Sequence, residues 1–153
     1  MSTNNAPTKQ STKVVDLRPT TNPSLQVVFI VLEKGKIQNI YTRDESNKQV
    51  ETPTCTALVA DETACCNLQL YGSAEVEYVQ VRDIVRLNQG IFSWQKKQLL
   101  LRAGRRGIFE KLGEFTMVFS EAVNMSHIGY KKDEQGNYQP AQSLPAHHWA
   151  PPA

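Results

Sequence analysis

The hydrophobic and polar positions of this chain alternate over short stretches, which is typical of β-strands. The segment LQVVFIVLEKG is rich in Val, Ile and Phe, and KIQNIYT follows it directly. After the polar turn RDESNKQ come five more apolar runs: CTALVAD, CCNLQLY, DIVRLNQG, FSWQKKQLLLRAG and GEFTMVF. Short runs of this kind, separated by turn residues, predict an all-β barrel or sandwich.

One segment between the apolar runs lacks their strand-like pattern. SAEVEYVQVR follows CCNLQLY and has room for one short helix. Five or six strands with a short helix after the third suit a small Greek-key barrel. We therefore predict an all-β, five-stranded OB-fold Greek-key barrel with one short helix, spanning residues 14–125.

The two ends of the chain differ from the middle in composition. Residues 1–13 are rich in Ser, Thr, Asn, Gln and Lys, and residues 126–153 carry Gly, Pro, Gln and His with few branched aliphatic side chains. Segments of this kind bury too little apolar surface to order themselves. We predict disordered tails at 1–13 and 126–153 on either side of one domain.

Alternate residues of a strand point to opposite faces, so two runs can be assigned an inner and an outer side. The inward positions predicted for the core are Cys66, Leu68 and Leu70 of one run and Leu99, Leu101 and Ala103 of the other. The outward positions are Cys65, Asn67, Gln69 and Tyr71, together with Gln98, Leu100 and Arg102. An outward aromatic ring near an outward arginine is the combination with which single-strand grooves hold bases and phosphates.

The distribution of basic residues along the chain also supports a nucleic-acid-binding surface. The net charge is only +2, but one stretch from Gln95 to Lys111 holds six basic residues and a single acid, Glu110. The basic residues are Lys96, Lys97, Arg102, Arg105, Arg106 and Lys111. Such a cluster is typical of a surface that attracts backbone phosphates. The segment GRRG within it predicts a turn at a strand end, and a merely solvated turn is the alternative.

Other chemistries find little support. Cys55, Cys65 and Cys66 are odd in number and lack metal-ligand spacing, so we expect a reducing compartment, no metal and no cofactor. The predicted domain offers no His as a catalytic base, so we expect no enzyme. The carboxylates Glu75, Glu77 and Asp83 indicate a solvated face. We also expect no signal peptide and no membrane association, since the longest apolar run, 27–32, is far too short to span a bilayer.

Several segments resemble a known family. VVFIVLEKG, VAD, RDIVRLNQG, LLLRAGRRG and KLGEFTMVFSEAVNMS are similar, in order and spacing, to the SOSS-B family over roughly 16–126. These are eukaryotic OB-fold single-stranded DNA-binding proteins of the sensor-of-single-stranded-DNA (SOSS) complex. The resemblance implies a nuclear protein that binds single-stranded DNA in the DNA damage response and double-strand break repair. It further implies docking on SOSS-A, the helical scaffold that also serves the Integrator complex as its third subunit, and leaves SOSS-C open as another partner.

The resemblance also implies particular binding residues. Tyr71 stands where the family usually has a stacking tryptophan, and Arg105 matches a basic residue. Three other aromatic positions of the family hold Ile91, Gln95 and Arg102 here. Phe92 and Trp94 lie beside them at the opposite parity; a bulge at Gly90 would turn them outward, and core packing is the alternative. The predicted nucleic-acid-binding set is Tyr71, Phe92, Trp94, Lys96, Lys97, Arg102, Arg105 and Arg106.

A second surface follows from the same likeness. The family's scaffold contact uses the Glu-Phe pair of GEF, which matches Glu114 and Phe115, with Met117 and Phe119 following. The loop after KGKIQNIY is longer than usual for the family. Two other functions remain open at this point: an assembly module that keeps the scaffold contact and has largely lost nucleic-acid binding, and an RNA-binding OB protein.

Overall fold

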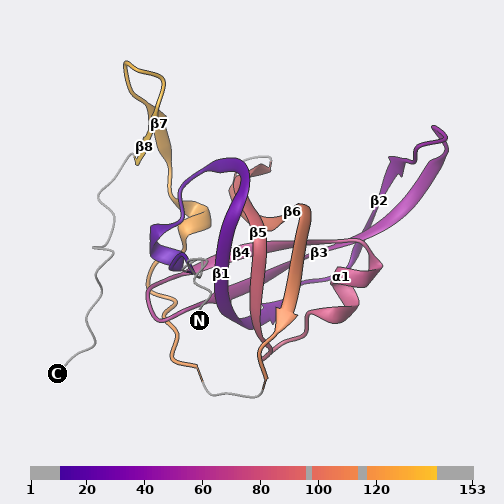
Figure 1. The fold of residues 1–153 in the computed structure, drawn as a ribbon, viewed down its shortest axis with the longest axis horizontal. Coiled ribbons are helices and arrows are strands. Elements are labelled where there is room, and N and C mark those ends of the chain that lie inside the picture. The colour runs from indigo at the N-terminus through magenta and orange to yellow at the C-terminus, as the bar shows by residue number, and fades with distance from the viewer. Residues whose placement is uncertain (1–10, 96–97, 114–116, 141–153) are drawn as a thin grey trace, which may run out of the picture.

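The computed structural model describes residues 11–95, 98–113 and 117–140. Strands dominate it, with one short α-helix and two 3-10 turns, Val14–Asp16 and Met125–His127 (Figure 1). In chain order the strands and the helix are β1 (Thr20–Lys34), β2 (Gln38–Arg43), β3 (Gln49–Ala60), β4 (Cys65–Tyr71), α1 (Ser73–Tyr78), β5 (Ile84–Gln95), β6 (Gln98–Lys111), β7 (Tyr130–Lys132) and β8 (Tyr138–Pro140).

Five of these strands close a barrel. The sheet runs β1-β5-β6-β4-β3-β2, and β1 also pairs with β3, so the first and fifth positions in that order meet. The β4–β6 pair is parallel, while the β1–β3, β1–β5, β3–β4 and β5–β6 pairs are antiparallel. With α1 between β4 and β5, this is the predicted five-stranded OB barrel, which confirms the fold class.

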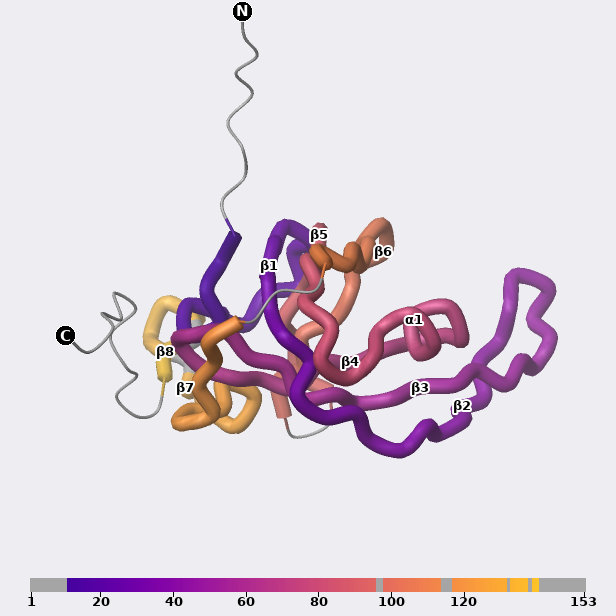
Figure 2. Tube along the Cα trace, turned by 90° about the horizontal axis from the view of Figure 1, so that it is seen from below, coloured from indigo at the N-terminus to yellow at the C-terminus, as the bar shows by residue number. Residues whose placement is uncertain are grey.

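The remaining strand of the sheet, β2, belongs to the long connection between β1 and β3. Its residues pair in continuous register with the first half of β3, from Gln38 opposite Thr54 to Arg43 opposite Gln49. The resulting hairpin projects from the barrel on the side opposite β7 and β8 (Figures 1 and 2). The extra length of this loop in the sequence is therefore an ordered arm.

Strand parity predicts most of the core correctly. Cys66, Leu68, Leu70, Leu99 and Leu101 are buried, as expected. Two residues predicted to face outward are buried as well. Cys65 is covered because the chain returns over it, with its amide donating to the Val123 carbonyl at 2.9 Å. Leu100 is buried in the floor of a groove on the outer face.

The predicted turn at GRRG is wrong, because these residues lie inside β6. Asn88 pairs with Ile108 and Gly90 with Ala103, so β6 carries three more residues than β5 over this interval. The excess bulges outward and carries Arg105 and Arg106. Glycine is needed at the bend: a Cβ on Gly104 would lie 2.7 Å from the Gln89 carbonyl oxygen.

The strand predicted at GEFTMVF is also absent from the residues described there. Gly113 and residues 117–119 have no strand structure, and 114–116 lie outside the described residues. The amide of Ser120 donates to the carbonyl of Asp61 at 2.8 Å, so this segment crosses the β3–β4 turn without joining the sheet ladder. Alternating apolar residues predicted a strand, but β6 already extends to Lys111 and completes the pairing with β5.

Order continues past the predicted domain end at residue 125. Ser126 and Ile128 are buried, and β7 and β8 form a small hairpin. The Ser126 hydroxyl accepts a hydrogen bond from the Asn67 amide at 2.7 Å, which ties this segment to β4. Within 126–153, the part up to residue 140 is thus structured rather than a disordered tail; residues 141–153, like 1–10, lie outside the described residues.

Candidate nucleic-acid interface

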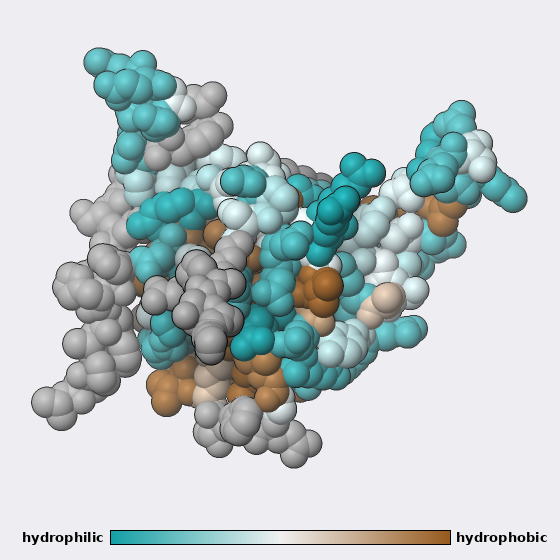
Figure 3. All heavy atoms as spheres, in the orientation of Figure 1, coloured by the Kyte–Doolittle hydropathy of each residue, from teal (hydrophilic) through white to brown (hydrophobic). Residues whose placement is uncertain are grey.

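The outer face of the barrel carries an open groove of about 1120 Å³. The surface is hollowed between the hairpin and the barrel, with mainly hydrophilic residues around the hollow (Figure 3). Residues of β2, β3, β4 and β6 line the groove, together with the end of β5, the β1–β2 connection and the start of α1. Its lining includes Lys36, Gln38, Ile40, Thr54, Cys55, Thr56, Gln69, Tyr71, Glu75, Gln98, Leu100, Arg102 and Arg105.

The strand registers determine which side chains meet there. Tyr71 pairs with Thr54, which in turn pairs with Gln38 of the hairpin. One step along β4, Gln69 lies between Thr56 and Arg102. Paired residues of neighbouring strands share one face of a sheet, so two adjacent rows of outward side chains form the groove surface.

Tyr71 lies at the end of β4 with about half of its surface exposed (49 %), as parity predicts. The chain turns directly after it, at Gly72, whose φ of +90° suits glycine. The Tyr71 amide donates to Glu75 Oε1 at 2.9 Å, because Glu75 in the first turn of α1 reaches back toward the strand. The backbone of Tyr71 is therefore fixed, while its side chain is half-exposed in the lining of the groove.

The groove contains three cations and one carboxylate among its described lining residues. Arg102 and Arg105 come from β6, and Lys36 from the β1–β2 connection. Arg102 Nη2 donates to Ser93 Oγ at 3.0 Å, which orients the guanidinium without neutralising it. Within the described part of the chain, Arg102 and Arg105 form no ion pair with an acid.

The carboxylate is Glu75, for which the sequence predicts a solvated face. It is half-buried, and burial raises its pKa even though the hydrogen bond from the Tyr71 amide acts in the opposite direction. Glu77, for which the prediction is the same, is exposed and does not line the groove. Glu75 therefore belongs to the site, where its carboxylate lies against the backbone amide of Tyr71.

Phe92 must be removed from the predicted binding set. It is fully buried, and the bulge that was expected to turn it outward lies before Gly90, as the change of register there shows. From Gly90 onward the pairing with β6 is regular, with Phe92 opposite the core residue Leu101. Since paired residues share a face, Phe92 points into the barrel.

Trp94 follows the same parity but lies nearer the end of the barrel, where it is 38 % exposed. Its ring meets that of Tyr130 edge-on, with centroids 6.0 Å apart and planes at 86°. Trp94 does not line the groove. It caps the barrel end against the β7–β8 segment, so a role in stacking a base is not supported by its position.

The other predicted site residues lie either outside the groove lining or outside the described residues. Arg106 is exposed on the bulge but outside the groove lining, and Lys96 and Lys97 lie outside the described residues. Among the predicted partner-binding residues, Glu114 and Phe115 also lie outside them. Met117 is half-buried, and Phe119 is 45 % exposed.

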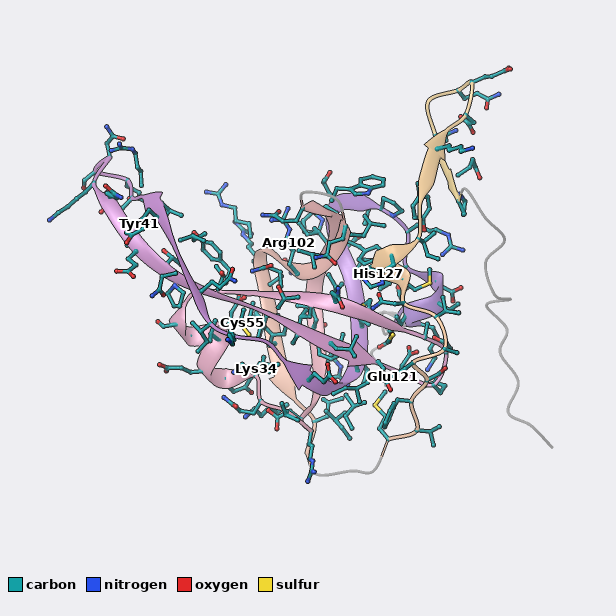
Figure 4. The ribbon with its side chains drawn as sticks, turned by 180° about the vertical axis from the view of Figure 1, so that it is seen from behind. Lys34, Tyr41, Cys55, Arg102, Glu121 and His127 are labelled. Carbon is teal, nitrogen blue, oxygen red and sulfur yellow. The ribbon has the colours of Figure 1, made fainter. Side chains whose placement is uncertain are left out.

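The β2–β3 hairpin forms one side of the groove, which the sequence did not predict. Gln38 and Ile40 line the groove, whereas Tyr41, the residue after Ile40, points to the opposite face and is 67 % exposed. Figure 4 shows Tyr41 out on the hairpin, away from Arg102 and Cys55 on the barrel. The alternation in KIQNIYT and the long connection were the available signals, but they did not reveal which face would turn toward the barrel.

Among the described residues, no three His, Cys, Asp or Glu side chains form a group that could hold a metal ion. Cys55, Cys65 and Cys66 are free and buried, and burial raises the pKa of the Cys66 thiol well above its usual value. In the same part of the chain, no helix has the length and apolar character needed to cross a membrane.

Comparison with known proteins supports the fold. The chain matches no family model. It resembles the solution structure of hypothetical protein F20O9.120 from Arabidopsis thaliana, with a TM-score of 0.64 and 19 % identity over 87 % of this chain and 94 % of the other. It also resembles the OB domain of Ta0387 from Thermoplasma acidophilum, with a TM-score of 0.51 and 15 % identity over 72 % and 93 % of the two chains. Likeness at this level of identity concerns architecture, and together with the closed five-stranded topology it identifies the chain as an OB-fold protein.

Proposed function

We propose that this protein binds single-stranded DNA in the groove on β3, β4 and β6, as the DNA-binding component of a SOSS-like complex in DNA repair. One observation carries the proposal: the open ring of Tyr71 and the guanidinium groups of Arg102 and Arg105, which have no acidic partner among the described residues, line the same groove. OB folds bind oligonucleotides on this part of the barrel, next to the loops that border it.

The expected contribution of each group follows from its chemistry. A base stacked on an aromatic side chain contributes roughly 1–3 kcal/mol. Each phosphate that a cation neutralises releases counterions, so the logarithm of affinity falls by about 0.7 per contact and decade of salt. With one open ring and three cations, moderate and strongly salt-dependent binding is expected.

A fluorescence titration tests the proposal. A labelled, unstructured DNA of about 15 nucleotides of mixed sequence, long enough for one OB fold, is titrated at low and at physiological salt. Tyr71→Ala should weaken binding roughly 5- to 150-fold, whereas Tyr41→Ala, at an exposed tyrosine outside the groove, should not. Absence of binding at low salt would remove the DNA-binding role.

The same titration with RNA of matching sequence addresses the RNA alternative. The groove residues give no sign of a dedicated contact to a 2′-hydroxyl, so we expect DNA to bind at least as tightly as RNA. A clear preference for RNA would transfer the proposal to that class of ligand.

A second candidate, the assembly module, is favoured by a different observation. Val118 and Phe119 are exposed neighbours, 72 % and 45 %, on the segment that follows β6. Adjacent exposed apolar side chains suit a contact with an apolar surface such as that of the SOSS-A scaffold, with SOSS-C as a further candidate. In a pull-down with the purified scaffold, Phe119→Ala should reduce capture and Arg105→Ala should not. We expect a nuclear location for the protein in either of these two functions.

A further inference from the structure

The charges of the groove are unevenly distributed. Arg102 and Arg105 lie on β6 and Lys36 on the β1–β2 connection, whereas Glu75, the one carboxylate among the described lining residues, lies at the start of α1 and contacts the Tyr71 backbone. Phosphates are therefore attracted to the β6 wall and repelled from the Tyr71 end. The part of a nucleic acid that reaches Tyr71 should be uncharged, a sugar or a base, and the base is the part that stacks on an aromatic ring.

Glu75 is held close to the backbone of Tyr71, in the lining of the same groove. Its Oε1 accepts the Tyr71 amide at 2.9 Å, so the carboxylate is positioned by the residue whose ring would stack the base. Glu75 forms no ion pair with the described cations. A carboxylate has about four lone-pair sites, and one hydrogen bond leaves capacity for a donor from a ligand.

We propose that Glu75 reads the base stacked on Tyr71 and favours bases with an exocyclic amine over thymine and uracil. The inference rests on the proposed function of the groove. Cytosine offers the N4 amine as a donor to a carboxylate, whereas thymine has the carbonyl oxygen O4 at the same position, which a carboxylate repels. These two pyrimidines have rings of similar size and stack with nearly equal free energy, so a difference in affinity reports the contact to the group at position 4.

The experiment compares the affinities of equally long oligo-dC and oligo-dT at neutral pH and low salt. A hydrogen bond to a charged group supports a preference of about tenfold for oligo-dC in the native protein. In Glu75→Gln the amide oxygen can still accept the Tyr71 N–H, and the new amide N–H₂ can donate to thymine O4. The preference should then fall to about onefold, even though the loss of negative charge strengthens binding of both oligomers.

Glu77→Gln is the matched control, since it makes the same change of charge on the same helix at an exposed position outside the groove. It should leave the dC to dT ratio unchanged. Equal binding of the two oligomers by the native protein, or a ratio that Glu75→Gln does not alter, would overturn the inference while leaving DNA binding intact. Failure of both oligomers to bind would overturn the proposed function as well.

Discussion

Replacing Phe92 with leucine distinguishes a core residue from a binding residue. Phe92 is fully buried opposite Leu101. Leucine has three fewer side-chain carbons, and at about 0.8 kcal/mol for each buried carbon the loss of transfer free energy is about 2 kcal/mol. The cavity left behind adds to this where the barrel cannot contract around it. Phe92→Leu should therefore lower the free energy of unfolding by about 2–3 kcal/mol.

Urea unfolding followed by tryptophan fluorescence measures that loss as a shift of the midpoint at constant slope. The affinity of the folded variant for DNA, measured well below the unfolding midpoint, should stay unchanged. Tyr71→Leu is the reciprocal control: its exposed ring should affect stability by less than about 0.5 kcal/mol and should weaken DNA binding. A Phe92→Leu protein of native stability with impaired DNA binding would refute the placement of this ring in the core.

Four further outcomes are expected. Gly104→Ala should destabilise the fold by about 1–3 kcal/mol in urea unfolding, because its Cβ would lie 2.7 Å from a backbone oxygen. Arg105→Ala should reduce the salt slope of DNA binding by about 0.7, as measured by titration over a range of salt concentrations. Burial raises the pKa of Glu75, so the folded protein binds this proton more tightly than the unfolded chain, and the free energy of unfolding falls as pH rises through that pKa. Glu75→Gln should therefore be more stable than the native protein at neutral pH. Below about pH 4, where Glu75 is protonated in both states, urea unfolding should show no difference between the two proteins. A chain shortened to residues 1–125 loses the buried Ile128, so its thermal unfolding should reveal a deficit of at least about 2 kcal/mol relative to a chain of 1–140.

The sequence predicts the barrel well where its strands are regular. In β4 the alternation places Leu68 and Leu70 inside and Tyr71 outside, and the structure agrees at all three positions. The period of two is strict in such a strand, so a single apolar set is enough to orient every side chain. The short helix after β4 was likewise visible from the change of pattern.

Prediction fails where the chain departs from that period. The three excess residues of β6 form an outward bulge. A pair of arginines flanked by glycines is equally compatible with a turn, so the sequence does not distinguish the two. The alternating apolar residues around 117–119 satisfy the pattern of a strand, yet β6 has already used the available edge of β5. Competition between segments for one partner strand is a tertiary property, and local pattern does not record it.

The candidate site shows the same division. Parity placed Tyr71 and Arg102 on the outer face of two runs that were expected to be near each other, but it did not show how those runs pair. What unites them in one groove is the parallel pairing of β4 with β6, which puts Gln69 beside Arg102 although the two positions are distant in the chain. Glu75 could not be recognised as a groove residue at all, since its place follows from the turn at Gly72, which brings the first turn of α1 back to the end of β4. The chemistry of this surface is therefore encoded in individual residues, whereas its geometry is encoded in the pairing of strands distant in sequence and in the turn that leads from β4 into α1.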